Sequence, residues 1–237
     1  MMVKICGITN REDALAAMET GASALGFNFW PASPRYVAPE RAGELLALVP
    51  AGVWKVGIFV NEARERVEWA ARTLVLDVAQ LHGQEAPRDY PSGVRVWKGF
   101  RAPRGAPAEF AVIGDAPPAG LVENASISAQ GGRGRRAAFE VPDLPAEAVL
   151  IDGPSSGRPF DWSLAAGLPQ RIIIAGGLDS GNVRQAIAAA RPWGVDACSR
   201  LESAPGRKDH AKMARFVLAA REAFIQTAQE AGDVSAA

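Results

Sequence analysis

The sequence has 237 residues, and 48% of them are apolar, which is enough for a packed core in one large α/β domain. Lysine plus arginine equals aspartate plus glutamate at 26 each, so no overall positive field favours nucleic acid or an anionic membrane as a partner. The pattern of a secretory leader is missing, and no apolar run approaches the ~20 residues that cross a bilayer. We therefore expect a cytoplasmic protein that binds neither nucleic acid nor membrane.

Short apolar runs rich in β-branched residues recur along the chain, and a helical pattern follows most of them. The eight candidate strands are residues 3–8, 24–29, 54–60, 76–82, 94–100, 148–153, 171–177 and 194–199. Several are apolar almost throughout, as is typical of strands buried on both faces of a parallel sheet. Eight strands alternating with helices predict a single (β/α)8 TIM barrel over residues 1–237. A doubly wound open sheet is the alternative that this pattern leaves open.

Polar residues before apolar stripes predict where helices begin and which side packs on the sheet. Asn10 and Asn61 are expected N-caps, a third helix is expected to start at Ser180 or Asn182, and the last is predicted over about 208–227. The residues expected to face inward are Leu15, Met18, Val67, Val183, Ile187, Met213, Phe216, Val217 and Phe224.

Residues 101–147 separate the fifth and sixth candidate strands and are rich in proline and glycine, without a sustained helical period. This composition predicts an irregular excursion within the barrel domain that replaces or decorates the fifth helix. The "FAVIG" run at 110–114 remains open as an additional strand. "GGRGRR" at 131–136 resembles a phosphate loop in composition, but its spacing does not fit one, so we interpret it as a solvated basic loop.

Active sites of (β/α)8 barrels form at the C-terminal ends of the strands, so polar residues at those positions are the candidates. They are Cys6, Asn28, His82, Lys98, Asp152, Gly176, Gly177, Asp196 and Ser199. A thiolate at Cys6 and a carboxylic acid at Asp152, on strands one and six, can act as base and acid on opposite sides of a substrate. From position alone, Cys6 remains open as a buried thiol, Asp152 as a turn residue and His82 as a packing residue.

The glycine pair after the seventh strand indicates a second kind of site. Gly176 and Gly177 let a ligand approach the backbone closely, and a helix begins nearby. Together with the turn "DACSRLE" after the eighth strand, they occupy the position where such barrels bind phosphate through backbone N–H groups. The sequence therefore predicts a phosphorylated small molecule as the substrate.

The motifs "VKICGIT", "GFNFWPASPRYV", "VGIFVN", "QLHGQE", "IIIAGGL" and "GVDACSRLE" occur in this order. The series resembles the phosphoribosylanthranilate isomerases of tryptophan biosynthesis. The resemblance implies a TIM barrel that performs an Amadori rearrangement, from an aminoaldose to an aminoketose, with no metal and no organic cofactor. It also implies roles for individual residues: Cys6 is the general base, Asp152 the general acid, Arg35 the partner of the anthranilate end, Asp196 and His82 substrate-binding residues, and Gly176, Gly177, Ser199 and Arg200 phosphate-site residues.

Two residues depart from the family pattern V-D-x-S-S-G-x-E after the eighth strand. Cys198 replaces the first serine, and Arg200 replaces the glycine. Arg200 either obstructs the phosphate or supplies a charge to it. The departures leave open a related sugar-phosphate isomerase with a shifted substrate, or an inactive relative that binds a ligand or a partner through 101–147. Either a monomer or a homodimer fits the composition.

Overall fold

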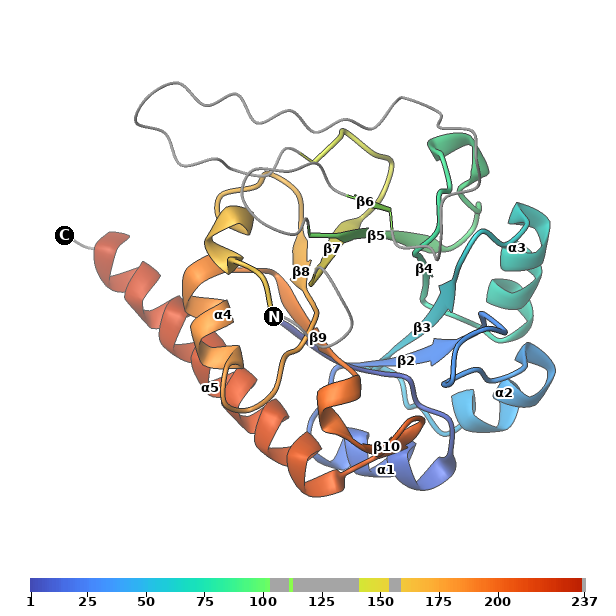
Figure 1. Cartoon of the computed structure of the whole chain (residues 1–237), viewed down its shortest axis with the longest axis horizontal. Helices are drawn as coiled ribbons and strands as arrows, with labels where there is room; N and C mark the ends of the chain where they lie inside the picture. Colours follow the sequence, from blue (N-terminus) through green and yellow to red (C-terminus); the bar gives the residue numbers. More distant parts are fainter. Residues whose placement is uncertain (103–110, 113–140, 154–158, 236–237) are drawn as a thin grey trace.

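The computed structural model describes residues 1–102, 111–112, 141–153 and 159–235, and it forms a closed barrel (Figure 1). The parallel strands are β1 (Met2–Cys6), β2 (Ala24–Asn28), β3 (Trp54–Phe59), β4 (Val78–Leu81), β5 (Arg95–Arg101), β7 (Ala148–Asp152), β8 (Ile172–Ile174) and β9 (Gly194–Ala197). Each pairs with the next, β9 returns to β1, and the pairing of β4 with β5 closes the circle. The predicted TIM barrel is confirmed, and the open-sheet alternative is wrong.

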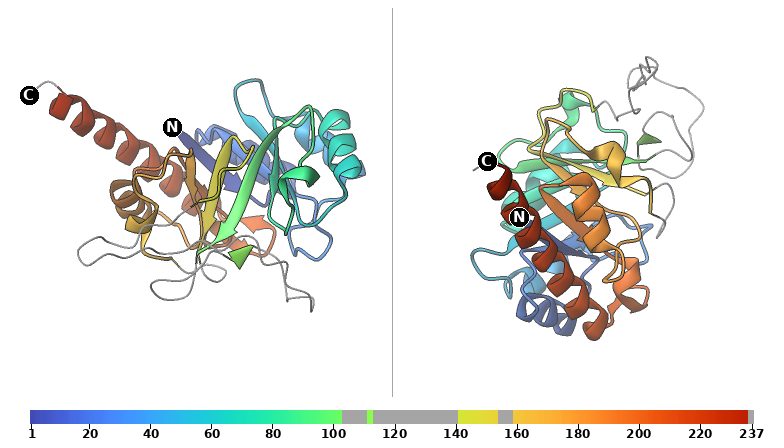
Figure 2. Two further views of the ribbon diagram at one scale, coloured as in Figure 1. Left: turned by 90° about the horizontal axis from the view of Figure 1, so that it is seen from above. Right: turned by 90° about the vertical axis from the view of Figure 1, so that its left-hand side faces the viewer.

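The helices that cover the barrel are unequal. The α-helices are α1 (Arg11–Glu19), α2 (Pro39–Leu46), α3 (Arg64–Thr73), α4 (Val183–Ala190) and α5 (His210–Ser235). Short 3₁₀ turns, η1 (Pro87–Asp89) and η2 (Trp162–Ala165), stand between β4 and β5 and between β7 and β8. After β9 come η3 (Ser199–Leu201) and a hairpin of β10 (Glu202–Ala204) and β11 (Arg207–Lys208). Figure 2 shows α5 crossing the outside of the barrel and projecting beyond it.

The predicted helix starts are partly correct. Asn10 caps α1, since its side chain accepts a hydrogen bond from the N–H of Asp13 at 2.9 Å. Asn182 is the N-cap of α4 by position. Asn61 does not cap α3, so that prediction is wrong. It adopts a left-handed φ of 50°, and its side-chain oxygen accepts the N–H of Gln84 at 2.6 Å, which ties the end of β3 to the loop after β4.

The inward faces of the later helices are as predicted, whereas that of α1 is only partly so, because Met18 is partly buried and packs against the core. The confirmed buried residues are Val67, Val183, Ile187, Met213, Phe216, Val217 and Phe224. In α1 the buried residues are Asp13, Ala14 and Ala17, while Leu15 is only partly buried. The face is rotated because the buried Asp13 carboxylate accepts the N–H of Lys208 and pairs with His210, both at 2.8 Å. The last helix also runs past the predicted end, to Ser235.

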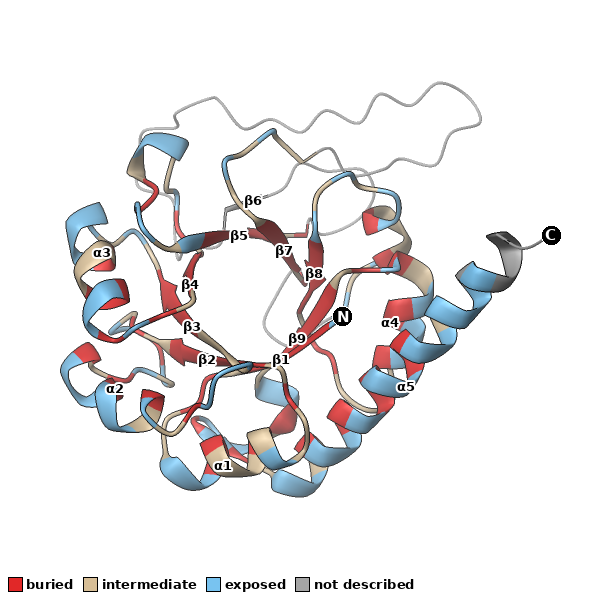
Figure 3. Ribbon diagram, turned by 180° about the vertical axis from the view of Figure 1, so that it is seen from behind, coloured by how far each residue is buried: buried red, intermediate tan, exposed pale blue. Residues whose placement is uncertain are grey.

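The inside of the barrel changes character from one end to the other. Side chains alternate between the two faces of each strand, so every second residue points inward. Apolar residues fill the interior at the end where the strands begin, where Trp54, Trp97 and Trp193 meet with ring centroids 5.6–5.8 Å apart. The buried polar residues Lys4 and Asp196 lie closer to the end where the strands stop. Figure 3 shows the strands buried around the whole circle. The polar end is therefore the end where the strands stop.

The excursion between β5 and β7 is described only in part. Within the "FAVIG" run, β6 (Ala111–Val112) pairs antiparallel with the end of β5, which confirms the additional strand. Residues 131–136, for which a solvated basic loop was predicted, lie outside the described residues. Among the helices that the structure describes, none combines the length and the apolar character needed to span a membrane.

Candidate active site

A cavity of about 410 Å³ opens at the C-terminal ends of the strands. Its lining includes nearly every residue predicted from the sequence: Cys6, Asn28, Arg35, His82, Asp152, Gly176, Gly177, Asp196, Ser199 and Arg200. They come from the inward positions at the ends of strands and from the loops that follow. The structure therefore brings the candidate acid, the candidate base and the candidate phosphate residues to one cavity.

Lys98 is the candidate that does not reach this cavity. Its ammonium group donates to the carbonyl of Gly83 at 2.6 Å and pairs with Glu85 at 2.5 Å, in the loop after β4. Side chains alternate between the two faces of a strand. Trp97 points into the barrel, so the next residue, Lys98, points away from it. Arg101 lines the cavity instead, next to Asp152 in the register of β5 and β7. Arg101 lies four residues after Trp97, so the two-residue period of the strand predicts that it points inward.

Lys4 and Asp196 form a buried ion pair at the cavity, which Asp196 lines, with Nζ of Lys4 2.8 Å from Oδ2 of Asp196. Burial opposes the charge of Lys4, but Asp196 and Cys6 outweigh it and raise the pKa of Lys4. Lys4 is therefore a fixed cation two residues before Cys6. Burial raises the pKa of Asp196 to about 7, although Lys4 opposes this. In the described part of the chain, Oδ1 of Asp196 is buried without a hydrogen-bond partner, so it can accept a bond from a ligand.

Cys6 ends β1 with its thiol in contact with that of Cys198. The hydrogen bond from Cys198 holds the pKa of Cys6 well below its usual range, and the cations Lys4 and Lys208 act in the same direction against burial. Cys198 is the donor of this hydrogen bond, and both this bond and the burial of its sulfur raise the pKa of its thiol. The sulfur that carries the negative charge is therefore that of Cys6, which suits a proton acceptor.

Asp152 ends β7 and has the opposite tendency. Burial raises the pKa of its carboxyl to about 6, although the N–H of Gly153 donates to Oδ1 at 2.8 Å and favours the charged form. A larger fraction of this carboxyl is therefore protonated near neutral pH than in an ordinary aspartate. One cavity thus holds a thiol with a lowered pKa and a carboxyl with a raised pKa.

Gly176 gives Asp152 the space that it occupies. Its φ is +86°, and a Cβ atom built there would lie 2.1 Å from the nitrogen of Gly153 and 2.6 Å from Oδ1 of Asp152. Any side chain at this position must displace the backbone at Gly153 and the carboxyl of Asp152 that this backbone holds.

We therefore expect Gly176→Ala to lower kcat by roughly 10²-fold, because a displacement of about 1 Å costs that much in a preorganised site. The measurement is steady-state kinetics. Gly167→Ala is the matched control, since Gly167 also has a positive φ, of +76°, but nothing lies within 4 Å of the added Cβ. Equal losses in both variants would assign the effect to backbone strain instead of to the carboxyl.

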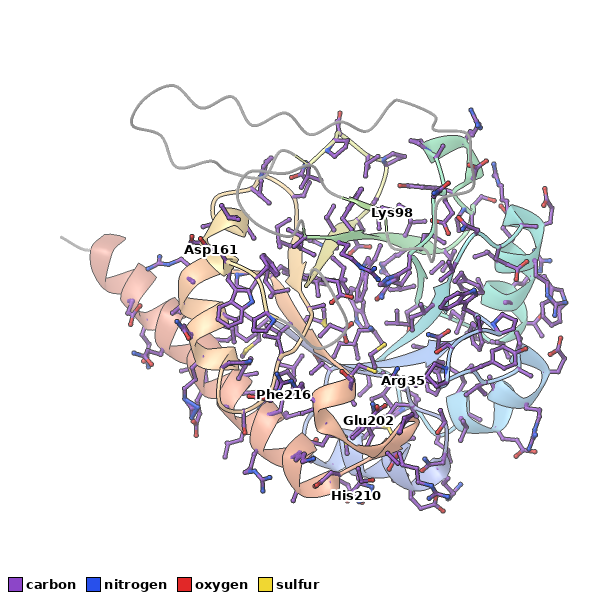
Figure 4. All side chains as sticks on the ribbon, viewed as in Figure 1. Arg35, Lys98, Asp161, Glu202, His210 and Phe216 are labelled. Carbon is purple, nitrogen blue, oxygen red and sulfur yellow. The ribbon has the colours of Figure 1, made fainter. Side chains whose placement is uncertain are left out.

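Arg35 follows β2 and is held by Glu202, a residue that the sequence reasoning missed. The guanidinium donates from Nε and Nη2 to the two carboxylate oxygens, at 2.8 and 2.6 Å (Figure 4). Lys208 also contacts Glu202, at 2.9 Å. Gly7, with φ +75°, makes room, because a Cβ there would lie 2.6 Å from Cδ of Arg35. Glu202 ends the motif "VDACSRLE", and this was the available signal.

His82 lines the cavity as a neutral ring. Burial, followed by the cations Lys4, Lys98 and Arg101, lowers its pKa to about 3. Its Nε2 contacts the side-chain amide of Gln80. His82 can therefore exchange a hydrogen bond with a ligand, but it brings no positive charge.

The candidate phosphate residues lie at the β8 and β9 end of the cavity. In the described part of the chain, the backbone N–H groups of Gly176, Gly177 and Ser199 donate no hydrogen bond. Free N–H groups of this kind suit an anion. Arg200 lines the same end, and its guanidinium lies 3.8 Å from Asp179. The residues expected at the phosphate site therefore lie together at one end of the cavity, and their role in binding phosphate stays a prediction.

The family profile and the relatives described by name below point to one family. The profile described as N-(5'phosphoribosyl)anthranilate (PRA) isomerase, PRAI, matches residues 3–141 and 138–219. The N-(5'-phosphoribosyl)anthranilate isomerase of Solibacter usitatus (strain Ellin6076) is 46% identical over 230 residues, which cover 94% of this chain and 99% of that protein.

Two solved structures are similar over the same extent. One is phosphoribosyl anthranilate isomerase in complex with reduced 1-(o-carboxyphenylamino)-1-deoxyribulose 5-phosphate, with a TM-score of 0.69 and 31% identity over 94% of this chain and 99% of that one. The other describes mutually generated monomers of the dimeric enzyme from Thermotoga maritima, with the same TM-score, identity and coverage.

Proposed function

Because this chain belongs to the N-(5'-phosphoribosyl)anthranilate isomerase family, and so is an isomerase of tryptophan biosynthesis, we propose how its residues perform the reaction. The substrate is N-(5-phospho-β-D-ribosyl)anthranilate, and the product is 1-(2-carboxyphenylamino)-1-deoxy-D-ribulose 5-phosphate. The Amadori rearrangement is an intramolecular redox reaction between an aldose and a ketose. It moves a proton from C2 and needs one acid and one base.

Asp152 is the general acid. In its protonated form it donates to the ring oxygen of the furanose, which opens the ring to a Schiff base. Burial supports this role, because it raises the pKa of Asp152 to about 6 and so keeps a proton available. Gly176 supports it further, by leaving space for the carboxyl.

Cys6 is the general base. Its thiolate removes the C2 proton from the Schiff base and gives an enolamine, which tautomerises to the ketone. Cys198 donates a hydrogen bond to this sulfur, and Lys4 supplies the nearby positive charge. Both stabilise the thiolate before substrate arrives, so the base is charged in the resting enzyme.

The two ends of the substrate bind at opposite sides of the acid–base pair. Arg35 takes the anthranilate carboxylate through the part of its guanidinium that Glu202 does not occupy. Asp196 accepts a hydrogen bond near the amine through Oδ1, and His82 contacts the substrate as a neutral ring. The N–H groups of Gly176, Gly177 and Ser199, which donate to no described residue, hold the phosphate, and Arg200 adds positive charge there.

The observation that carries this proposal is the pairing of a low-pKa thiol with a raised-pKa carboxyl in one cavity. Purified protein is expected to convert phosphoribosylanthranilate to the aminoketose without added metal or cofactor. To test for a shifted substrate, kcat/KM for phosphoribosylanthranilate is compared with kcat/KM for the aminoaldose of the histidine pathway. A higher value for that compound would reject the anthranilate assignment, and tight binding without turnover would indicate an inactive relative.

The pH dependence follows from the two protonation states. Cys6 must be deprotonated and Asp152 protonated, so rising pH first helps the base and then removes the acid. Because the pKa of Asp152 is about 6, we expect kcat/KM to fall above that pH, approaching about tenfold per pH unit. A profile of kcat/KM against pH measures this fall. A kcat/KM that rises from pH 6 to 8 would contradict a protonated Asp152.

The assembly and location of the protein are part of the proposal. A monomer or a homodimer is expected, and the relative from Thermotoga maritima is described as dimeric. Light scattering on the purified chain distinguishes the two. We expect the enzyme in the cytoplasm, where its thiols stay reduced.

A further inference from the structure

The two cysteines of the chain lie at the ends of neighbouring strands. Cys6 is the last residue of β1, and Cys198 directly follows β9. The register pairs Ile5 of β1 with Ala197 of β9, so Cys6 and Cys198 are the next residue on each side. Both fall at inward positions, and their thiols are in hydrogen-bond contact. Neighbouring strands lie about 4.8 Å apart, which is within the Cα separation of ~4.4–6.8 Å that a disulfide accepts. The backbone therefore brings the two cysteines together at neighbouring strand ends, at a spacing that a disulfide accepts.

The same pair is accessible to a small oxidant. Both cysteines line the cavity, both are free, and both are only partly buried. The ammonium group of Lys208 lies 3.7 Å from the sulfur of Cys198, and the carboxylate of Glu202 lies 4.0 Å from it. A thiolate beside a second thiol in an open site is the arrangement in which peroxide oxidation leads to a disulfide.

We propose that Cys6 and Cys198 are a site of reversible oxidation, at which a hydroperoxide forms an intramolecular disulfide and stops the isomerase. The thiolate of Cys6 attacks one oxygen of hydrogen peroxide, the O–O bond breaks, and a sulfenic acid and hydroxide result. The sulfur of Cys198 then attacks the sulfenic sulfur. The S–S bond forms, the S–O bond breaks, and the oxygen leaves as water with the proton of Cys198. Peroxide is reduced, and the two sulfurs are oxidised.

The disulfide and its effect on activity depend on different premises. The bond depends on the placement of the two sulfurs alone. The loss of activity rests on the proposed function, because it requires Cys6 to be the base. A dithiol such as dithiothreitol reverses the bond by exchange and restores the thiolate.

The test uses the full chain treated with a small excess of hydrogen peroxide. Peptide mapping without reductant is expected to find the Cys6 and Cys198 peptides joined, at a mass lower by two hydrogen atoms. Activity is expected to fall by about 10²-fold or more, as for loss of a general base, and to return with dithiothreitol. In Cys198→Ser, compared with its own untreated activity, peroxide is expected to cause a loss that dithiothreitol does not reverse, because Cys6 proceeds to the sulfinic acid.

Each other outcome overturns a stated part. If no joined peptide forms while Cys6 becomes over-oxidised, the disulfide is rejected and the isomerase assignment stands. If wild type and Cys198→Ser lose activity equally and irreversibly, Cys198 has no protective role. If the joined peptide forms and activity is unchanged, the switch is rejected, and Cys6 is not the base.

Discussion

Cys6→Ser is expected to lower kcat by about 10²–10⁴-fold, the range that a general base contributes. A serine hydroxyl keeps its proton at neutral pH, and Lys4 and the Cys198 thiol, which stabilise a thiolate here, do not suffice to ionise an alcohol. The KM is expected to change little, because the proposal assigns no substrate-binding role to Cys6. Steady-state kinetics on a sample with an unchanged circular dichroism spectrum and Tm measures both quantities. Full activity in this variant would remove the thiolate from the mechanism.

Cys198→Ala is the variant that separates the base from its environment. It keeps the sulfur of Cys6 and removes the hydrogen bond that most lowers its pKa. The acidic limb of the kcat/KM profile is therefore expected to move to higher pH. At alkaline pH, where Cys6 is deprotonated in both proteins, the kcat/KM of the variant is expected to approach that of the wild type. If Cys198→Ala loses as much kcat as Cys6→Ser at every pH, packing around the thiols explains both results better than base catalysis does.

The barrel was predictable because each strand can be recognised from its local sequence. Each is a short apolar run between polar turns, and burial on both faces of a parallel sheet requires this composition. Helix boundaries were less predictable. Asn61 is a good N-cap by type, but a contact with Gln84 across the loop fixes it in a left-handed conformation instead. Leu15 is apolar, yet Asp13 is the buried residue, because Lys208 and His210 bind its carboxylate. These partners come from the other end of the chain, so the local pattern does not predict them.

The site shows the same division between local and distant information. The placement of Cys6 and Asp152 in the cavity was predictable from their positions at strand ends, whereas their catalytic roles stay a proposal. The contact of Arg35 with Glu202 joins residues 167 apart in the sequence, and no local pattern encodes it. Lys98 points away from the cavity because side chains alternate along β5, which places Arg101 there instead. The perturbed pKa values also depend on partners that only the closed barrel brings together, such as Lys4 beside Asp196.

Asp152→Asn tests the other half of the mechanism with the smallest change of shape. The amide fits the space that Gly176 leaves, but it cannot give up a proton to the ring oxygen, so kcat is expected to fall by about 10²–10⁴-fold. The alkaline limb of the pH profile, assigned to the carboxyl with its pKa of about 6, is expected to disappear from the remaining activity.

Asp77→Asn is the matched control, because Asp77 precedes β4 at the opposite end of the barrel, where its carboxylate accepts the N–H of Lys55 at 2.8 Å. That variant should keep the kcat and the pH profile of the wild type. An Asp152→Asn enzyme that loses kcat but keeps the alkaline limb would show that another group sets this limb. Asp196, with its pKa raised to about 7 by burial, is the group in the same cavity that would then have to be tested as the acid.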